Sequence, residues 1–387
     1  MGTLFLIIIY LAFISLGLPD SILGSGWPAM RIELNSPLSM AGVISMIICG
    51  STVISSFFSS VIIKKIGTGM TTLLSVLMTA IALMGFSYSQ SLIFIILFSI
   101  PLGLGAGAID AALNNYVARH YNAKHMSWLH CFWGVGATIG PVIMGQYINK
   151  DSSWRGAYFT IAIIQFILVF VLFFSLPYWK SSKTEGNKEI HKESKVNILR
   201  IVGIKPSLIT FLFYCGVEAT IGLWASSYLI NVKDVSISEG ARYASIFYLG
   251  ITIGRFINGF VTMILSSKNI IRIGLGTIVL GAILLMFPMP IVISIIGIIL
   301  LGVGCAPIYP SMLHETPNRF GEENSQKIMG IQMAVAYIGS TSFPVIFGFI
   351  FSHVSLMLYP FIIGICAITM VICSEKVNNI VKVIGKK

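Results

Sequence analysis

The chain has few charged residues for its length. Asp, Glu, Lys and Arg together make up only 10% of the 387 residues, whereas 56% are hydrophobic. The mean hydropathy is +0.90. Soluble domains carry roughly a quarter charged residues, so this composition excludes an ordinary soluble domain. It predicts a membrane protein that crosses the bilayer many times.

Several sequence motifs of soluble enzymes are also missing. The six cysteines lie singly within apolar runs and form no CxxC pair, so we expect buried thiols instead of disulfides or metal ligands. No GxxxxGKS/T loop is present, which argues against ATP as the energy source. Neither an HExxH motif nor a recognisable Ser/His/Asp set occurs, so we expect no enzymatic activity, no metal and no cofactor. Because no Lys or Arg precedes the first apolar run, a cleaved signal peptide is not expected.

Long apolar runs dominate what is present. A membrane-spanning helix needs about 20 residues, and twelve runs reach that length or come close to it. They lie at 4–30, 39–63, 70–88, 92–118, 126–148, 156–177, 205–231, 241–265, 271–288, 291–313, 327–351 and 355–373. The predicted fold is all-α, with twelve transmembrane helices in two bundles of six. The N-terminal bundle covers residues 1–178, a polar linker 179–203, and the C-terminal bundle 204–387.

The net charge of +11 follows a topological pattern. Most of the Lys and Arg residues lie in alternate short connections between apolar runs and in the linker. The positive-inside rule therefore places the linker and both termini in the cytoplasm, and the charge gives no reason to expect a nucleic-acid partner. We expect a multi-pass protein of the plasma membrane of a bacterial cell.

The two halves of the chain resemble each other. Leu102-Gly103-Leu104-Gly105 recurs as Leu301-Gly302-Val303-Gly304, and the PVIMG sequence at 141–145 recurs as PVIFG at 344–348. Asp20 and Glu218 each lie in the first helix of a half, with a glycine four residues later. All three offsets are roughly 200 residues, which indicates a duplicated six-helix unit.

Five segments carry a resemblance to a known family. Residues 17–28 (GLPDSILGSGWP), 110–117, 128–141, 216–224 and the pair 254–255 look like the fucose-permease-like branch of the major facilitator superfamily. This resemblance implies two six-helix halves with a solute site between them near the middle of the membrane. One departure is clear: residues 64–67 read KKIG, without the Asp that normally precedes Arg and Gly in the superfamily signature. The family's usual gating contact is therefore not expected there.

Three carboxylates lie well inside the predicted spans: Asp20, Asp110 and Glu218. An acid at the middle of the membrane costs about 2.5–3.5 kcal/mol on insertion scales, which favours a functional role. The resemblance implies proton or cation coupling for Asp20 and Asp110, because they match the acids of the family's first and fourth helices. Structural alternatives remain for both, since Asp20 follows Pro19 at an expected kink and Asp110 can be satisfied by a neighbouring helix.

A face of small and polar residues surrounds Asp110. Gly103, Gly107, Asp110 and Asn114 share one side of a helix because of their spacing. The glycines serve either close helix packing or close approach of a solute. Amides offer both donors and acceptors, so Asn114 is expected to bind hydroxyl groups of a sugar.

The remaining candidate residues divide between solute binding and gating. Glu218 is expected to bind substrate hydroxyls; the alternatives are binding of Na⁺ together with nearby oxygens, hydrogen bonds from the opposing half, and a purely structural role. Trp27 and Trp224 either stack on a sugar ring or anchor the helix ends at the membrane interface. Tyr309, which occupies the position of Asp110 in the second repeat, and Gln332 are further expected solute contacts. His130 and Arg255 are assigned to relay or gating, with hydrogen-bonded packing as the alternative.

These observations predict a secondary active transporter. It would move a small hydrophilic solute, most readily a sugar, by alternating access coupled to H⁺ or Na⁺. One alternative is an exporter of amphipathic compounds, favoured by the 12% aromatic content and 17 methionines. An alternative of another class is a membrane receptor or scaffold that transports nothing. The expected partners are the solute and the lipid bilayer, with no obligate protein partner.

Overall fold

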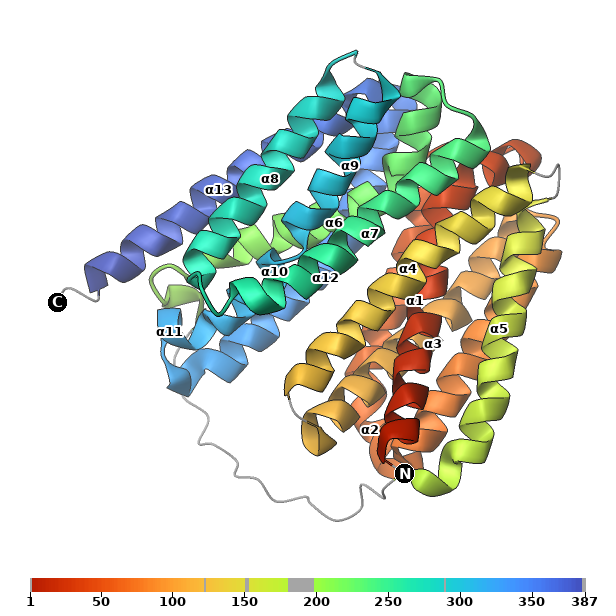
Figure 1. Ribbon diagram of the computed structural model, residues 1–387, viewed down its shortest axis with the longest axis horizontal. Helices are drawn as coiled ribbons and strands as arrows, with labels where there is room; N and C mark the ends of the chain where they lie inside the picture. The colour runs from red at the N-terminus through yellow and green to blue at the C-terminus, as the bar shows by residue number, and fades with distance from the viewer. Residues whose placement is uncertain (1, 122, 150–152, 180–197, 289, 385–387) are drawn as a thin grey trace. The chain divides into compact units, whose positions relative to one another are not determined.

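The computed structural model describes residues 2–121, 123–149, 153–179, 198–288 and 290–384 (Figure 1). In these ranges every secondary-structure element is a helix. Eleven segments are long and apolar enough to cross a membrane, and α4 is a further helix of 27 residues. The predicted all-α fold with twelve transmembrane helices is therefore confirmed.

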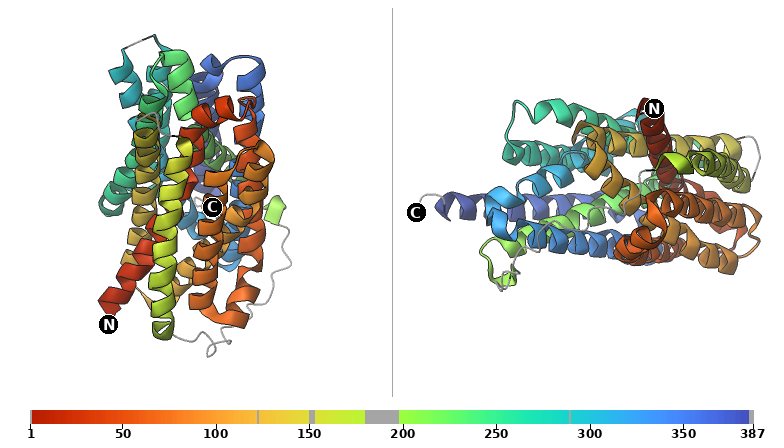
Figure 2. Two further views of the ribbon diagram at one scale, coloured as in Figure 1. Left: turned by 90° about the vertical axis from the view of Figure 1, so that its right-hand side faces the viewer. Right: turned by 90° about the horizontal axis from the view of Figure 1, so that it is seen from below.

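The order of the helices can be followed in Figures 1 and 2. They are α1 (Gly2–Glu33), α2 (Met40–Tyr88), α3 (Leu92–His120), α4 (Ala123–Asn149), α5 (Trp154–Ser175), η1 (Leu176–Tyr178), η2 (Ile198–Arg200), α6 (Ile204–Lys233), α7 (Ile237–Val261), α8 (Ser267–Met286), α9 (Ile291–Cys305), α10 (Ile308–His314), α11 (Thr316–Phe320), α12 (Glu322–His353), η3 (Leu356–Leu358) and α13 (Tyr359–Ile384).

Helix α2 contains two membrane spans, Met40–Ser59 and Val61–Tyr88, which correspond to the predicted runs 39–63 and 70–88. The backbone bends at Gly67, whose φ of 82° and ψ of 161° are not helical. Glycine suits this position because it lacks the Cβ that disfavours a positive φ. Another span, Ile291–His314, is formed by two helices, α9 and α10, and corresponds to the predicted run 291–313.

The chain divides into two compact units. The first contains Met1–Lys188 and Ala225–Ser245, and the second contains Glu189–Trp224 and Ile246–Lys387. The predicted bundles 1–178 and 204–387 remain our proposal for the functional halves of the chain. Most of the predicted linker 179–203 lies outside the described residues.

In the first unit, α1 packs closely against α4. A Cβ atom built on Gly17 would overlap the backbone oxygen of Trp133, and one on Gly136 would overlap the backbone oxygen of Ile14. The two helix backbones are therefore in direct contact, which only glycine permits at these positions. This contact places Asp20 on α1 beside Trp133 on α4.

The glycine face of α3 packs in the same way against α2. A Cβ atom on Gly103 or Gly107 would overlap the backbone oxygen of Ile48 or Thr52. The Thr52 hydroxyl donates a hydrogen bond to the backbone oxygen of Gly103 at 3.1 Å, and the Ser56 hydroxyl donates one to that of Gly107 at 3.2 Å. These glycines therefore serve helix packing, which is one of the two roles that the sequence allows.

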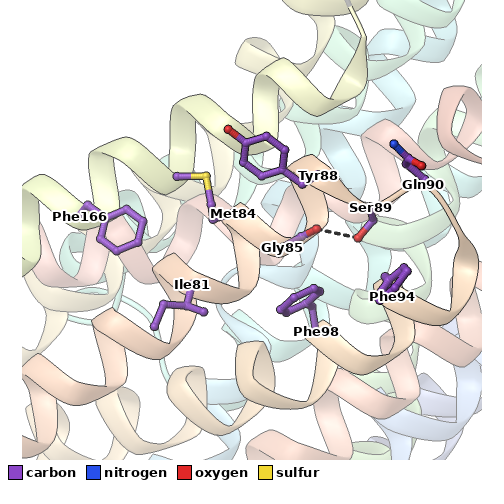
Figure 3. A pocket seen from close by; sticks show the side chains of 9 residues that line it. All are labelled: Ile81, Met84, Gly85, Tyr88, Ser89, Gln90, Phe94, Phe98 and Phe166. Atoms are coloured by element: carbon purple, nitrogen blue, oxygen red, sulfur yellow. Dashed lines mark hydrogen bonds between the residues drawn. The ribbon is translucent and has the colours of Figure 1, made fainter.

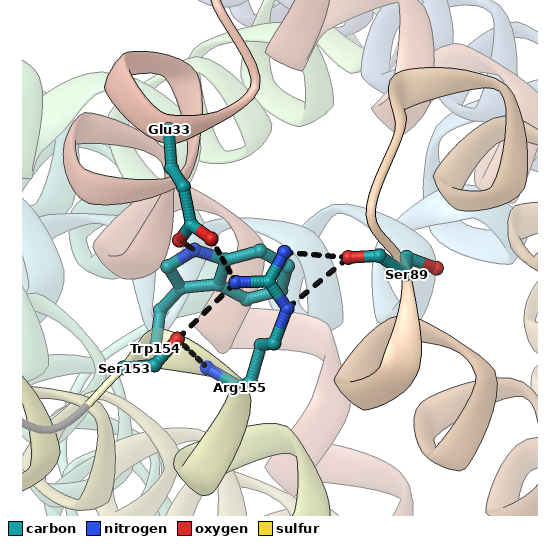
Figure 4. A network of polar contacts seen from close by, with 5 residues as sticks. All are labelled: Glu33, Ser89, Ser153, Trp154 and Arg155. Atoms are coloured by element: carbon teal, nitrogen blue, oxygen red, sulfur yellow. Dashed lines mark hydrogen bonds and ion pairs between the residues drawn. The ribbon is translucent and has the colours of Figure 1, made fainter.

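A polar cluster joins the ends of α1 and α2 to the start of α5 (Figure 4). The Arg155 guanidinium donates to the backbone oxygen of Ser89 through Nε at 3.1 Å and Nη2 at 2.7 Å, and it forms an ion pair with Glu33. The Trp154 indole donates to Glu33 Oε2 at 2.6 Å, and the guanidinium lies 4.4 Å from the centre of the indole ring. One arginine therefore holds three helix ends together.

We expect Arg155→Lys to destabilise the first unit. A lysine has no planar fork, so it cannot reach Ser89 and Glu33 together while lying flat on the ring of Trp154. Hydrogen bonds to charged groups are worth about 1.5–3 kcal/mol, and the loss should lower the melting temperature measurably. The exposed Arg200 supplies the control variant Arg200→Lys. Equal melting temperatures for the two variants would contradict this role of the cluster.

The second unit is built around α8, which packs against α9, α10 and α13. Gly281 and Gly297 face each other across the α8–α9 contact, where each Cβ would lie about 3 Å from the other's backbone oxygen. A buried polar network links Gln332 on α12 to two other helices. The Thr316 hydroxyl donates to Gln332 Oε1 at 2.9 Å, and Gln332 Nε2 donates to the Ser207 hydroxyl at 3.1 Å.

Candidate functional site

Asp20 is exposed although it lies in the middle part of α1. The Trp133 indole on α4 donates a hydrogen bond to its Oδ2 atom at 2.8 Å. The α1–α4 contact at Gly17 and Gly136 sets this distance, because any larger side chain there would separate the helices. A carboxylate facing lipid at this depth would be costly, so the exposed side of Asp20 is expected to face water.

Asp110 lies on α3 in the same unit and is half-buried. Asn114, one turn further along the helix, donates a hydrogen bond from Nδ2 to Asp110 Oδ1 at 2.9 Å. Asp20 and Asp110 both accept a hydrogen bond from an uncharged donor, so either can take up a proton without leaving a partner cation unpaired.

Glu218 and Arg255 form an ion pair in the second unit. Arg255 Nη2 on α7 lies 3.6 Å from Glu218 Oε1 on α6, and the two side chains are 20% and 21% exposed. The sequence alone does not indicate this pairing, because α6 and α7 are separate helices and their facing sides depend on packing. Glu218 thus differs from Asp20, the acid at the matching position of the first half, because an arginine neutralises the Glu218 carboxylate.

The two tryptophans proposed as stacking platforms are fully buried in the structure. Trp27 is 0% exposed and donates to the backbone oxygen of Leu38 at 2.9 Å. Trp224 is also 0% exposed and donates to the backbone oxygen of Pro344 at 3.0 Å. Neither indole ring presents a face to a solute here. This structure therefore gives no support to the predicted stacking on a sugar ring, and none to the alternative of anchoring at the membrane interface. The indoles instead hold helix segments together.

The other predicted residues are placed in different surroundings. Gln332 is 1% exposed and bonded within the buried network described above, so it does not face a solute in this structure. Tyr309 on α10 is half-buried, with its ring 5.8 Å from that of Phe211. His130 on α4 is half-buried and contacts the Phe13 ring edge to face at 5.7 Å. Tyr309 and His130 remain candidates for solute contact and proton relay.

Trp133 is a candidate that sequence reasoning did not assign to the site. It lies in the 128–141 segment that carries the family resemblance, yet its link to Asp20 depends on how α1 crosses α4. Glycines at matching depths in both helices, Gly17 and Gly136, are the signal that would have indicated the contact. Within the described residues, no group of three or more His, Cys, Asp or Glu side chains is arranged to hold a metal ion.

A cavity of about 500 Å³ lies elsewhere in the first unit, where α2, α3 and α5 meet (Figure 3). Its lining is almost entirely aromatic and aliphatic and contains no carboxylate. The lining residues are Ile81, Met84, Gly85, Tyr88, Ser89, Gln90, Phe94, Phe98 and Phe166. This cavity suits an apolar group and includes none of the predicted coupling or solute-binding residues.

In the described part of the chain, eleven segments are long and apolar enough to cross a membrane, and Asp20, Asp110 and Glu218 lie well inside them, which defines a multi-pass integral membrane protein. The chain belongs to the Major Facilitator Superfamily, a family of transporters, whose family model matches residues 9–344 and 243–374. This match confirms the superfamily indicated by the sequence. The expectation that the protein is not an enzyme agrees with what the family does.

Two curated relatives are named as sugar or sugar phosphate transporters. The glucose/mannose transporter GlcP of Bacillus subtilis (strain 168) is 24% identical over 317 residues, covering 79% of this chain and 77% of that protein. A probable hexose phosphate transport protein of Chlamydia trachomatis is 22% identical over 303 residues, covering 70% of this chain and 64% of that protein.

Two solved structures share the fold. A mutant of the nucleoside transporter NupG gives a TM-score of 0.77 at 13% identity, over 96% of this chain and 98% of that one. A bacterial homologue of the human lysosomal transporter Spinster, in an inward-facing and occupied conformation, gives 0.68 at 10% identity, over 97% and 96%. At these identities the likeness concerns the fold alone.

Proposed function

We propose that the protein is a secondary active transporter that takes up a sugar together with H⁺ by alternating access. One observation carries most of this proposal: Asp20 is exposed at mid-span in the same unit as Asp110, and both acids accept hydrogen bonds from neutral donors. The relation to a glucose/mannose transporter supports a neutral sugar as the solute. The protein would lie in a bacterial plasma membrane with both termini in the cytoplasm.

The transport cycle follows from the cost of a charge in the membrane. Asp110 or Asp20 takes up a proton from the outside, and the solute binds to hydroxyl-binding groups such as Asn114. Neutralising the acid lowers the cost of closing the loaded cavity, so the two halves can rock and open inward. Release of the sugar and loss of the proton to the cytoplasm then restore the carboxylate. Asp20 and Asp110 act as coupling residues in this scheme.

The first test is a thermal-shift screen of the purified protein followed by counterflow. Glucose, mannose and other small solutes are added across a range of pH, with and without Na⁺. We expect a neutral hexose to raise the melting temperature independently of Na⁺, and the same sugar to undergo counterflow in liposomes. Stabilisation that requires Na⁺ would contradict H⁺ coupling, and binding without counterflow would indicate a receptor instead of a transporter.

A further inference from the structure

The apolar cavity in the first unit has no role in the proposed transport cycle. It lies where the end of α2, the start of α3 and the middle of α5 meet, and all three helices belong to membrane spans (Figure 3). Three of its lining side chains, Ile81, Tyr88 and Phe94, are exposed on the surface of the unit. Exposed apolar and aromatic side chains on a span are typical of a surface that faces lipid. The cavity therefore opens toward the bilayer.

The walls of the cavity are formed by one glycine and several large side chains. A Cβ atom on Gly85 would lie 2.5 Å from atoms of the Phe98 ring, so this ring packs directly against the backbone of α2. Met84 and Phe166 are half-buried and contribute further apolar lining from α2 and α5. The volume of about 500 Å³ lies within the range of about 300–1,000 Å³ that is usual for ligand sites. The cavity is thus large enough for a flexible hydrocarbon chain.

Water is a poor occupant for this cavity, because a buried water molecule needs about two to four polar partners. The polar side chains of the lining, Tyr88, Ser89 and Gln90, are consecutive and lie at one end of it. Ser89 uses its polar groups within the protein: its hydroxyl donates to the backbone oxygen of Gly85 at 2.6 Å, and its backbone oxygen accepts two hydrogen bonds from Arg155. Within a membrane, the apolar molecule available to fill such a space is the acyl chain of a lipid.

A charged pair lies at the same end of the cavity. Ser89 belongs both to the cavity lining and to the polar cluster of Figure 4, in which Arg155 and Glu33 form an ion pair. The Arg155 and Glu33 side chains are 23% and 47% exposed, so both charges remain accessible. A guanidinium attracts a phosphate group, and a carboxylate attracts an ammonium group. A headgroup that carries both groups therefore matches the pair better than an anionic headgroup, which Glu33 would repel.

We propose that this cavity binds one acyl chain of a zwitterionic phospholipid, with the headgroup at Arg155 and Glu33. A lipid chain gains no hydrophobic energy when it leaves other chains for the cavity, because both surroundings are apolar. Its retention depends instead on close contact with the cavity walls and on the charges of the headgroup. The cavity includes no residue assigned to sugar binding or coupling, so this inference is independent of the proposed function.

The test measures lipid binding to delipidated protein in detergent by native mass spectrometry. Three lipids with identical chains are compared: zwitterionic dioleoyl phosphatidylethanolamine, anionic dioleoyl phosphatidylglycerol, and dioleoylglycerol, which has no charged headgroup. We expect the wild type to bind one molecule of the phosphatidylethanolamine at least about tenfold more tightly than either other lipid. Glu33→Gln should lose the preference over phosphatidylglycerol, because only the arginine charge remains. Glu239→Gln, which alters an acid at another helix start of the same unit, should keep it.

Filling the cavity should remove the lipid. Ile81→Trp enlarges a side chain on the α2 wall and Phe166→Trp one on the α5 wall, and each should weaken binding of phosphatidylethanolamine at least about tenfold. Leu74→Trp is the matched control, because Leu74 is exposed about two turns earlier on the same side of α2 and does not line the cavity. It should bind the lipid as the wild type does. Melting temperatures without lipid show whether each variant is folded, and the use of two filling variants prevents one misfolded protein from deciding the result.

Three results would overturn the inference. Equal binding of phosphatidylethanolamine and either other lipid by the wild type would exclude the headgroup contact. Unchanged binding by both folded filling variants would place the lipid outside the cavity, and an equal loss in Leu74→Trp would indicate a general effect of tryptophan on the lipid-facing surface. Sugar counterflow is measured separately, so each of these results leaves the proposed function intact, and absence of counterflow would leave the lipid site intact.

Discussion

Liposomes containing the Asp110→Asn variant are expected to exchange labelled sugar across the membrane but not to concentrate it. The amide has nearly the shape of the acid and can still bond to Asn114, so the helix and the solute site should persist. It cannot take up and release a proton. Without coupling, a carrier only equilibrates its solute, and the accumulation ratio under an imposed pH gradient should fall to about one.

The control for this experiment is Asp234→Asn. Asp234 is exposed in the connection between α6 and α7 and has a φ of 54°, a conformation that asparagine also tolerates. Asp234→Asn also removes one negative charge, but at a position outside the membrane spans. It should leave the accumulation of sugar unchanged. Full accumulation by Asp110→Asn would exclude Asp110 as the coupling residue.

Gly17→Ala and Gly136→Ala are expected to destabilise the protein strongly and to abolish transport. The added methyl groups would meet the backbone oxygens of Trp133 and Ile14, and backbone atoms in packed helices cannot move aside at low cost. Overpacking of this kind costs typically about 1–3 kcal/mol per site. If α1 and α4 moved apart to relieve these overlaps, Asp20 would also move away from the Trp133 indole.

A matched glycine in α2 provides the comparison. A Cβ atom on Gly50 would meet nothing within 4 Å, so Gly50→Ala should be neutral or slightly stabilising, because alanine favours the helix. Melting temperatures in detergent and sugar uptake would be measured for all three variants. If Gly136→Ala and Gly50→Ala melt at the same temperature, the close α1–α4 contact is not what holds this region together.

The number and position of the spans could be predicted from hydropathy alone. Lipid offers no partner for backbone N–H and C=O groups, so a long apolar run in a membrane must be a helix. The duplication within the sequence also indicated the superfamily. Repeated segments such as 141–145 and 344–348 have to meet the same packing requirements in both halves. The match to the family model confirms that inference.

Hydropathy and repeats could not predict which side chains pair between neighbouring helices. The pairing of Glu218 with Arg255 depends on which sides of α6 and α7 face each other. Trp27 and Trp224 illustrate the same limit, because a tryptophan near the end of a span can serve equally in the core, at the interface or in a binding site. Their full burial follows from the crossing of neighbouring helices, which one sequence does not specify.

The most direct test of the account is proton movement driven by sugar. Wild-type protein is reconstituted into liposomes without any pH or electrical gradient, a neutral hexose that passed the binding screen is added outside, and internal pH is followed with a trapped dye. Coupled uptake predicts acidification of the interior that depends on the sugar and disappears in Asp110→Asn. Sugar entry without any change of internal pH would contradict coupling to H⁺ and with it the role assigned to Asp20 and Asp110.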